Sequence, residues 1–284
     1  MAHPVYMTRE FYGLPAPPGT ALPTPAELLE LCTKRHPRGW NVGLAYPPEA
    51  PIFWIKYPHV IWNELVAQNM AHEGLKRLQS PVRAPAVYYA CEMEFGRSID
   101  SFAVMEFVPG KIAAERLQDA EDSKSKDATY SLIALALPEL HRIPVPPGSR
   151  PAAVNGGRIR HICFDMQEAP HHYRTVAQLE DLLNQFLVMA RREDRIKDLT
   201  REPLVFCYSD IWLGNFIIDD SRITIIDFSE ASILPSSFSK HAVAWRESQI
   251  RCNISHLVVI PTTNGVDNTS ALREATSAMA MRSG

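Results

Sequence analysis

Three oxygen-bearing side chains stand out because they lie at the ends of short apolar segments between residues 204 and 230. This stretch reads LVFCYSDIWLGNFIIDDSRITIIDFSE, and it predicts short strands at 204–207, 216–218 and 223–226. The last two strands are separated by a polar turn and form a predicted β-hairpin. Asp210 follows the first strand, Asn215 opens the second and Asp227 closes the third. We therefore expect two carboxylates and one amide to converge at one edge of this unit.

Carboxylate and amide oxygens are ligands that a hard cation such as Mg2+ prefers. Kinases use an aspartate that orients the acceptor hydroxyl, an asparagine five residues later that holds metal, and a second aspartate after a hairpin. Asp210, Asn215 and Asp227 have this order and spacing. Each residue alone is equally well explained as a turn or strand-end residue, since Asp and Asn are common in turns. Together they predict phosphoryl transfer, with Asp210 as the catalytic residue and Asn215 and Asp227 as metal ligands.

The segments SDIWLGNFIID and ITIIDFSEA resemble the catalytic segment of the aminoglycoside phosphotransferase and choline kinase-like families, and most closely fungal phosphotransferase-domain proteins of undetermined substrate. The resemblance implies an α+β, bilobal protein-kinase-like fold, with a small N-terminal β-rich lobe and a larger, mainly helical C-terminal lobe. It also implies ATP, Mg2+ and a small-molecule hydroxyl acceptor. The family usually has a histidine two positions before the aspartate, where this chain has Tyr208. That histidine mostly supports the loop.

A lysine occurs within the predicted strand 52–57, IFWIKY, which precedes a predicted helix at 62–78. Lys56 lies among apolar and aromatic neighbours and needs a partner, because an isolated buried charge is costly. By resemblance, Lys56 contacts the nucleotide phosphates and Glu64 on the following helix braces it. Glu73 is the competing partner. Lys56 is also explained as an edge-strand lysine that reaches water, and Glu64 as a favourable charge at a helix N-terminus.

The strand predicted at 101–107 ends in Val-Pro-Gly, where proline and glycine break it. In the family, the segment matching MEFVPG connects the two lobes, and its backbone groups face the adenine. The resemblance therefore assigns to nucleotide binding the residues Glu106, Phe107 and Val108. A glycine-rich phosphate loop is not evident, since Gly39 and Gly43 lack the repeated-glycine spacing.

Composition limits the classes of partner. The chain has 284 residues, of which 46% are hydrophobic and 21% charged, as in a globular protein. A net charge of -3 without a block of like charge argues against nucleic acid and membrane surfaces as partners. The five cysteines are scattered without metal-ligand spacing, which favours a reducing compartment. With neither a secretory signal nor a run of about 18 apolar residues, we expect a cytoplasmic protein. Oligomeric state is not predicted.

Three parts are expected along the chain, namely an extended proline-rich lead-in at 1–25, a nucleotide-binding lobe at 26–107 and a catalytic, acceptor-binding lobe at 108–284. Thr24 and Pro25 predict the start of a helix that ends near residue 36.

Further helices are predicted at 130–142 and 176–191, and Pro138 should kink or end the first of them. The polar stretch 118–128 is interpreted as a surface turn. A last helical part is expected from residue 232, but the amphipathic helices that wall the acceptor site in the family are not evident in the final stretch.

A second hypothesis is a nucleotide-binding but inactive kinase-like protein that serves as a scaffold or sensor. Tyr208, the missing glycine loop and the atypical C-terminus favour it, whereas Asp210, Asn215 and Asp227 oppose it. Phosphorylation of proteins is less favoured, because no activation loop with an A-P-E pattern follows Asp227. The acceptor is not named by any residue, and aminoglycosides, choline, ethanolamine, sugars and other hydroxylated metabolites all stay open.

Overall fold

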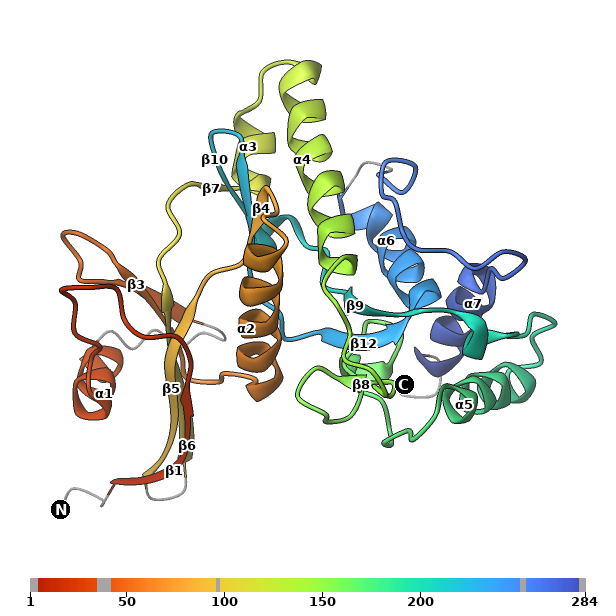
Figure 1. Cartoon of the computed structure of the whole chain (residues 1–284), viewed down its shortest axis with the longest axis horizontal. Helices are drawn as coiled ribbons and strands as arrows, with labels where there is room; N and C mark the ends of the chain where they lie inside the picture. The colour runs from red at the N-terminus through yellow and green to blue at the C-terminus, as the bar shows by residue number, and fades with distance from the viewer. Residues whose placement is uncertain (1–4, 35–41, 96–97, 251–253, 281–284) are drawn as a thin grey trace.

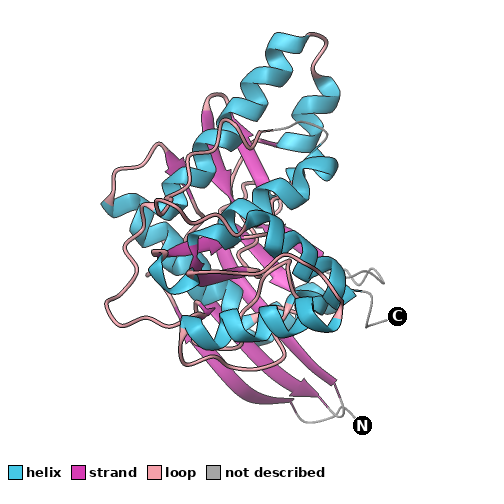
Figure 2. Cartoon of the chain, turned by 90° about the vertical axis from the view of Figure 1, so that its right-hand side faces the viewer, coloured by secondary structure: helices cyan, strands magenta, loops and turns pink. Residues whose placement is uncertain are grey.

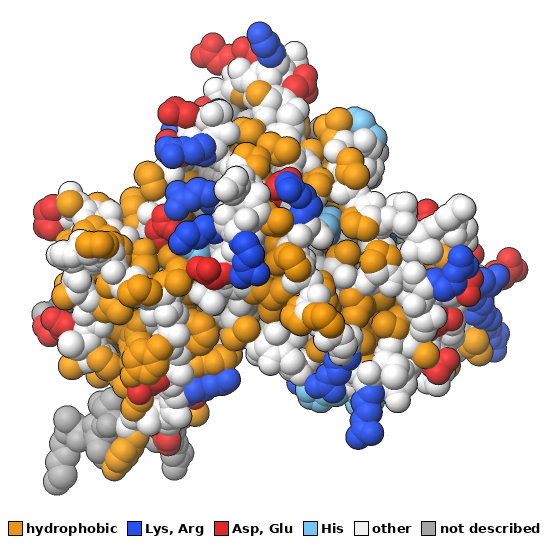
Figure 3. All heavy atoms as spheres, in the orientation of Figure 1, with side chains coloured by type: hydrophobic (Ala, Val, Ile, Leu, Met, Phe, Trp, Pro, Cys, Tyr) orange, Lys and Arg blue, Asp and Glu red, His pale blue; other side chains and the backbone are white. Residues whose placement is uncertain are grey.

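The computed structural model describes residues 5–34, 42–95, 98–250 and 254–280. Figure 1 shows a β-rich N-terminal part on the left, beside a larger part that contains most of the helices. The predicted α+β fold, with a small β-rich N-terminal lobe and a larger, mainly helical C-terminal lobe, is therefore confirmed. On the face in Figure 3, acidic and basic side chains lie next to one another and form no large block of one sign.

The N-terminal lobe is built on a five-stranded antiparallel sheet. In spatial order its strands are β1 (Val5–Tyr12), β5 (Val87–Phe95), β6 (Ser98–Glu106), β3 (Phe53–Tyr57) and β2 (Val42–Tyr46). Within the lead-in predicted at 1–25, the segment Val5–Tyr12 is extended and forms β1, which pairs with β5. No proline lies between Pro4 and Pro15, so this segment can donate ladder hydrogen bonds.

Two helices pack against this sheet. Helix α1 (Pro25–Lys34) begins where predicted, and the Glu27 carboxylate accepts hydrogen bonds from the Thr24 backbone N and hydroxyl at 2.7 and 2.8 Å. Its predicted end near residue 36 lies outside the described residues. Helix α2 (Trp62–Arg77) confirms the predicted helix and contacts both lobes. Leu65 packs on the N-terminal sheet, whereas Ala67, Ala71 and Leu75 join the core of the C-terminal lobe.

Two small sheets underlie the candidate catalytic segment. One has the order β4 (Val82–Arg83), β11 (Arg222–Ile225), β10 (Phe216–Asp219) and β7 (Lys111–Ile112). Strands β10 and β11 form the predicted hairpin, with Asp220 in the left-handed region at φ +53°. The other sheet has the order β8 (Ala152–Ala153), β12 (Ala231–Pro235) and β9 (Leu204–Tyr208). The three strands predicted between residues 204 and 226 are therefore present.

Helices cover the rest of the C-terminal lobe, as the turned view in Figure 2 shows. They are α3 (Ala113–Asp119), α4 (Ser123–His141), α5 (Val176–Met189), α6 (Ser236–Ile250) and α7 (Thr269–Ala280). Short 3-10 turns occur at η1 (Asp165–Gln167), η2 (Leu199–Arg201) and η3 (Leu213–Asn215).

Three expectations for these helices need correction. Helix α4 begins inside the polar stretch expected to be a turn, because the Asp122 side chain accepts a 2.7 Å hydrogen bond from Ser125 N and caps it. It also continues past Pro138 to His141. The last helical part begins at Ser236, since the preceding residues form β12.

The final stretch, which did not look amphipathic, forms helix α7. Its residues Leu272, Ala275 and Met279 are buried in one core with residues of α5 and α6. The small side chains let this helix pack closely.

The described cysteines are free, buried thiols, namely Cys32, Cys91, Cys163 and Cys207. Within the described ranges, every helix is too short or too polar to cross a membrane.

One buried histidine in this lobe should make stability depend on pH. His241 on α6 is 1% exposed, and its Nε2 lies 3.0 Å from Thr276 Oγ1 on α7. Burial, and secondarily Arg273, lowers the pKa of His241 from 6.5 to about 4. The unfolded chain therefore binds a proton first as pH falls, so the contribution of His241 to stability is present above pH 6.5 and is lost towards pH 4.

We expect the free energy of unfolding to fall by about 2 kcal/mol between pH 7 and pH 5 on this account, as measured by urea denaturation. This part of the pH dependence should disappear in His241→Gln and persist in His172→Gln, where an exposed histidine is replaced. Equal pH slopes in the wild type and His241→Gln would contradict the prediction.

Candidate active site

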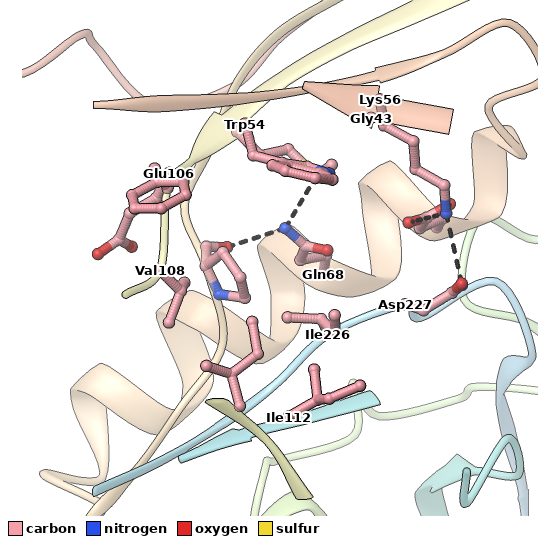
Figure 4. A pocket seen from close by; sticks show the side chains of 14 residues that line it. Gly43, Trp54, Lys56, Gln68, Glu106, Val108, Ile112, Ile226 and Asp227 are labelled. Atoms are coloured by element: carbon pink, nitrogen blue, oxygen red, sulfur yellow. Dashed lines mark hydrogen bonds and ion pairs between the residues drawn. The ribbon is translucent and has the colours of Figure 1, made fainter. Parts of the chain in front are cut away.

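A cavity of about 310 Å³ lies between the N-terminal sheet, helix α2 and the β10–β11 hairpin (Figure 4). It is lined by Gly43, Trp54, Lys56, Glu64, Gln68, Pro85, Met105, Glu106, Phe107, Val108, Ile112, Ile217, Ile226 and Asp227. All the residues predicted to contact the nucleotide, and one of the two predicted metal ligands, are in this set. Segments far apart in the sequence therefore meet here.

Lys56 occupies one end of the cavity between two carboxylates. Its Nζ donates to both carboxylate oxygens of Glu64, at 2.7 and 2.8 Å, and to Asp227 Oδ2 at 3.4 Å. Glu64 is 2% exposed, whereas Glu73 is 39% exposed and lies beside His72. Glu64 is therefore the partner of Lys56, and the alternative of a Lys56–Glu73 pair is wrong.

Burial and charge act in opposite directions on this pair. Burial lowers the pKa of Lys56, but the attraction of Glu64 and Asp227 is greater and the pKa is raised overall. Burial raises the pKa of Glu64, and the Lys56 ammonium opposes that rise. Lys56 is therefore a charged group in a fixed position, suited to an anion in the cavity.

Asp210 and Asn215 lie together in the loop between β9 and β10. Asn215 Nδ2 donates to Asp210 Oδ2 at 2.9 Å and to the Asp210 backbone oxygen at 3.0 Å. The Asn215 backbone oxygen accepts a 2.9 Å hydrogen bond from Ile226 N, the residue before Asp227. These contacts place Asn215 against Asp210 and hold its backbone beside the residue that precedes Asp227.

Tyr208 supports this loop in the place where a histidine was expected. Its hydroxyl donates to the Ile226 backbone oxygen at 3.0 Å, and its ring contacts Phe216 and Phe228 at centroid distances of 6.5 and 5.3 Å. Asp227 itself has φ +56°, a left-handed conformation that is uncommon for a residue with a side chain. The Tyr208 contact thus holds the residue next to a strained turn.

Asn63 joins α2 to the segment that follows Asp227. Its Nδ2 donates to the backbone oxygens of Ser229 and Ala231 at 3.1 and 2.8 Å, and its Oδ1 accepts from Asn155 N at 3.1 Å. The side chain is 2% exposed. Asn63 was not predicted, since no local pattern distinguishes it from an ordinary residue in the first turn of a helix.

The segment Glu106–Val108 lines the cavity where the N-terminal lobe meets the C-terminal lobe. Figure 4 shows the Glu106 carboxylate turned away, where it pairs with Arg83 and accepts a 3.1 Å hydrogen bond from Ala86 N. Phe107 N donates to the Ile52 oxygen at 2.9 Å.

Trp54 forms one wall of the cavity, across from Ile112 and Ile226 (Figure 4). A Cβ on Gly43 would lie 2.2 Å from Trp54 Cζ2, so the glycine makes room for the indole. Gly43 therefore has a packing role at the wall of the cavity. Gly39, the other candidate, lies outside the described residues. Trp54 was missed, although an aromatic residue two positions before Lys56 was the available signal.

The oxygen ligands offered by Asn215 and Asp227 suit a metal ion that also binds phosphate oxygens. Across the described residues, no group of three or more His, Cys, Asp or Glu side chains could hold a metal ion. Asn215 and Asp227 offer an amide and a carboxylate oxygen, and Mg2+ typically uses one or two protein carboxylates with phosphate and water completing its shell. The residues present fit Mg2+ bound together with a nucleotide.

Comparison with known proteins gives one match at the level of family. Residues 66–236 match the sequence profile described as "Phosphotransferase enzyme family" (APH). This range includes Asp210, Asn215 and Asp227 and begins just after Glu64. No curated protein matches the chain.

Solved structures similar to this chain include aminoglycoside phosphotransferases. The ternary complex of APH(2")-IIa with streptomycin and ATP has a TM-score of 0.41 and 16% identity, over 90% of this chain and 87% of that chain. A thermostable mutant of APH(4)-Ia with AMP-PNP and hygromycin B has a TM-score of 0.48 and 14% identity, over 89% and 88%. Because the family profile covers more than half of the 284 residues, the chain belongs to the phosphotransferase enzyme family.

Proposed function

We propose that the protein is an ATP- and Mg2+-dependent phosphotransferase that moves a phosphoryl group to a hydroxyl of a small molecule. The observation that carries this proposal is the position of Lys56 between Glu64 and Asp227, at the end of an otherwise largely apolar cavity. Such a cavity accepts a flat base along its length and an anionic group at Lys56. We also propose a lobe boundary between Phe107 and Val108.

Asp210 is the proposed group that orients the acceptor hydroxyl and accepts its proton. Its carboxylate accepts a hydrogen bond at Oδ2 from the Asn215 amide, which fixes the position of the side chain in the loop. Lys56 positions the phosphates, braced by Glu64. Mg2+, held by Asn215 and Asp227, supplies neutralisation of the phosphate charge when bound.

The proposed acceptor is a small hydroxylated molecule, and the proposal extends only to this class. APH(2")-IIa is described with streptomycin and APH(4)-Ia with hygromycin B. Streptomycin and hygromycin B are described for those two proteins only. The proposal for this chain rests on its own Asp210–Asn215 loop.

Trp54 provides a further prediction for this cavity. If a nucleobase lies between the indole and Ile226, Trp54→Ala should weaken binding of Mg-ATP about tenfold, because stacking of a base on an aromatic ring contributes about 1–3 kcal/mol. Isothermal titration calorimetry measures the change, with Tyr6→Ala as a control that removes an exposed aromatic residue of β1. Unchanged affinity in Trp54→Ala would show that the base lies elsewhere.

The proposed function is tested by thermal unfolding with and without Mg-ATP. Ligand at about a hundredfold its dissociation constant stabilises a binding protein by about 2.7 kcal/mol, so the wild type should melt at a higher temperature with Mg-ATP. The shift should disappear in Asp227→Ala and persist in Asp219→Ala, a matched change in the same hairpin. No shift in the wild type would overturn the proposal, and an equal shift in Asp227→Ala would place the metal elsewhere.

Binding without transfer would favour the alternative, an inactive nucleotide-binding scaffold or sensor. A panel of hydroxylated acceptors, with ADP release as the readout, separates the two hypotheses. Turnover in the wild type that is lost in an Asp210 variant supports the enzyme.

A further inference from the structure

A buried amide projects into the middle of the cavity. Gln68 lies on α2 one turn after Glu64 and is 1% exposed. Figure 4 shows its side chain between the wall formed by Trp54 and the opposite wall formed by Ile226. Among the described residues that line the cavity, Glu64 and Asp227 lie at the Lys56 end and the Glu106 carboxylate points away.

The orientation of the Gln68 amide is determined by its neighbours. Its Nε2 donates to the Pro85 backbone oxygen at 3.2 Å and to Met105 Sδ at 3.2 Å. Reversing the amide would place its oxygen against the Pro85 carbonyl oxygen, which is repulsive. Both amide hydrogens are therefore used, and the oxygen is the group that remains for the cavity. That oxygen accepts no hydrogen bond from any described residue.

The position of this acceptor identifies which part of a ligand it would meet. Lys56 and Asp227 mark the end of the cavity that suits phosphates, and Val108 lies at the opposite end in Figure 4. Gln68 lies between these ends, against Met105 on the strand that leads to Val108. A flat base stacked on Trp54 would thus present its edge to the Gln68 oxygen.

We propose that the Gln68 side-chain oxygen selects a nucleobase with an amino group at its edge, so that the phosphoryl donor is an adenine nucleotide. The inference rests on the proposed function and deepens it. An adenine amino group donates to this oxygen, whereas a 6-oxo purine such as guanine or hypoxanthine places a second acceptor against it. An acceptor that faces another acceptor in a buried site leaves both unsatisfied.

The test is the ratio of the dissociation constants of IDP and ADP, measured by calorimetry with Mg2+ in the wild type, Gln68→Leu and Asn69→Leu. IDP differs from ADP at the 6-position, where an oxygen replaces the amino group. We expect the wild type to bind ADP at least about tenfold more tightly than IDP, and Gln68→Leu to reduce that ratio about tenfold. Asn69→Leu removes a neighbouring amide of α2 that does not line the cavity, and should keep the wild-type ratio.

A ratio of two affinities measured on one preparation is insensitive to partial unfolding, because a smaller folded fraction weakens both ligands alike. An unchanged ratio in Gln68→Leu, or tighter binding of IDP by the wild type, would overturn the role of Gln68 and leave the proposed function standing. Failure of the wild type to bind either nucleotide would overturn the proposed function, and the inference with it.

Discussion

Replacing Asp210 with asparagine is expected to lower phosphoryl transfer about a thousandfold and to leave Mg-ATP affinity unchanged. Asparagine keeps the size of the side chain and one oxygen for the Asn215 amide, but it cannot accept a proton. Asp210 also does not line the cavity that contains Lys56 and Asp227, so nucleotide binding should not depend on it. Single-turnover measurements of ADP formation, together with calorimetry, separate the two effects.

Asp220→Asn is the matched control, since this exposed residue lies in the turn of the neighbouring hairpin and its left-handed conformation suits asparagine. It should retain wild-type rates. Full activity of Asp210→Asn would show that another group orients the acceptor. Loss of nucleotide affinity in that variant would instead mean that Asp210 shapes the nucleotide site.

Replacing Lys56 with methionine should have two separate consequences. Binding of Mg-ATP should be lost, because Lys56 is the one lysine among the described residues that line the cavity. The protein should also be destabilised by about 3–5 kcal/mol, because Glu64 is left buried without its partner. Burial already raises the pKa of Glu64, and removing the ammonium raises it further. The destabilisation should therefore be greater at pH 8 than at pH 6, where more of the carboxyl is neutral.

The double variant Lys56→Met/Glu64→Gln tests this explanation. It removes the buried charge together with its partner, so urea denaturation should show recovered stability without recovered nucleotide binding. Lys111→Met, which removes an exposed lysine paired with Asp119, should leave stability almost unchanged, because solvent screens an exposed ion pair. If the single and double variants are equally unstable, the Glu64 charge is not the cause.

The parts of the fold that the sequence predicted are those with strong local signals. Strands 204–207, 216–218 and 223–226 were recognised from apolar runs bounded by polar turns, and α2 from its length. The start of α4 was missed because its first turn is polar and depends on the Asp122 cap. Helix α7 was missed because small residues such as Ala275 give little amphipathic contrast until α5 and α6 are in place.

At the site, too, residues with a local sequence signal were predicted and residues that depend on distant contacts were not. Asp210, Asn215 and Asp227 were predicted from order and spacing, and their convergence follows from a hairpin that is local in the chain. Asn63 could not be predicted, since the groups it contacts lie 92 and 166 or more residues away. Gln68 was missed for a similar reason. The orientation of its amide depends on Pro85 and on Met105 of β6, which lie 17 and 37 residues further along the chain.

The contacts of Asn63 also resist movement of α2 away from the C-terminal lobe. Swinging α2 outward would strip two backbone oxygens and one N–H of their partner, at a cost of about 1–3 kcal/mol for each buried group. Glu64 lies on the same helix, so the Asn63 contacts also hold Glu64 in the position where it pairs with Lys56.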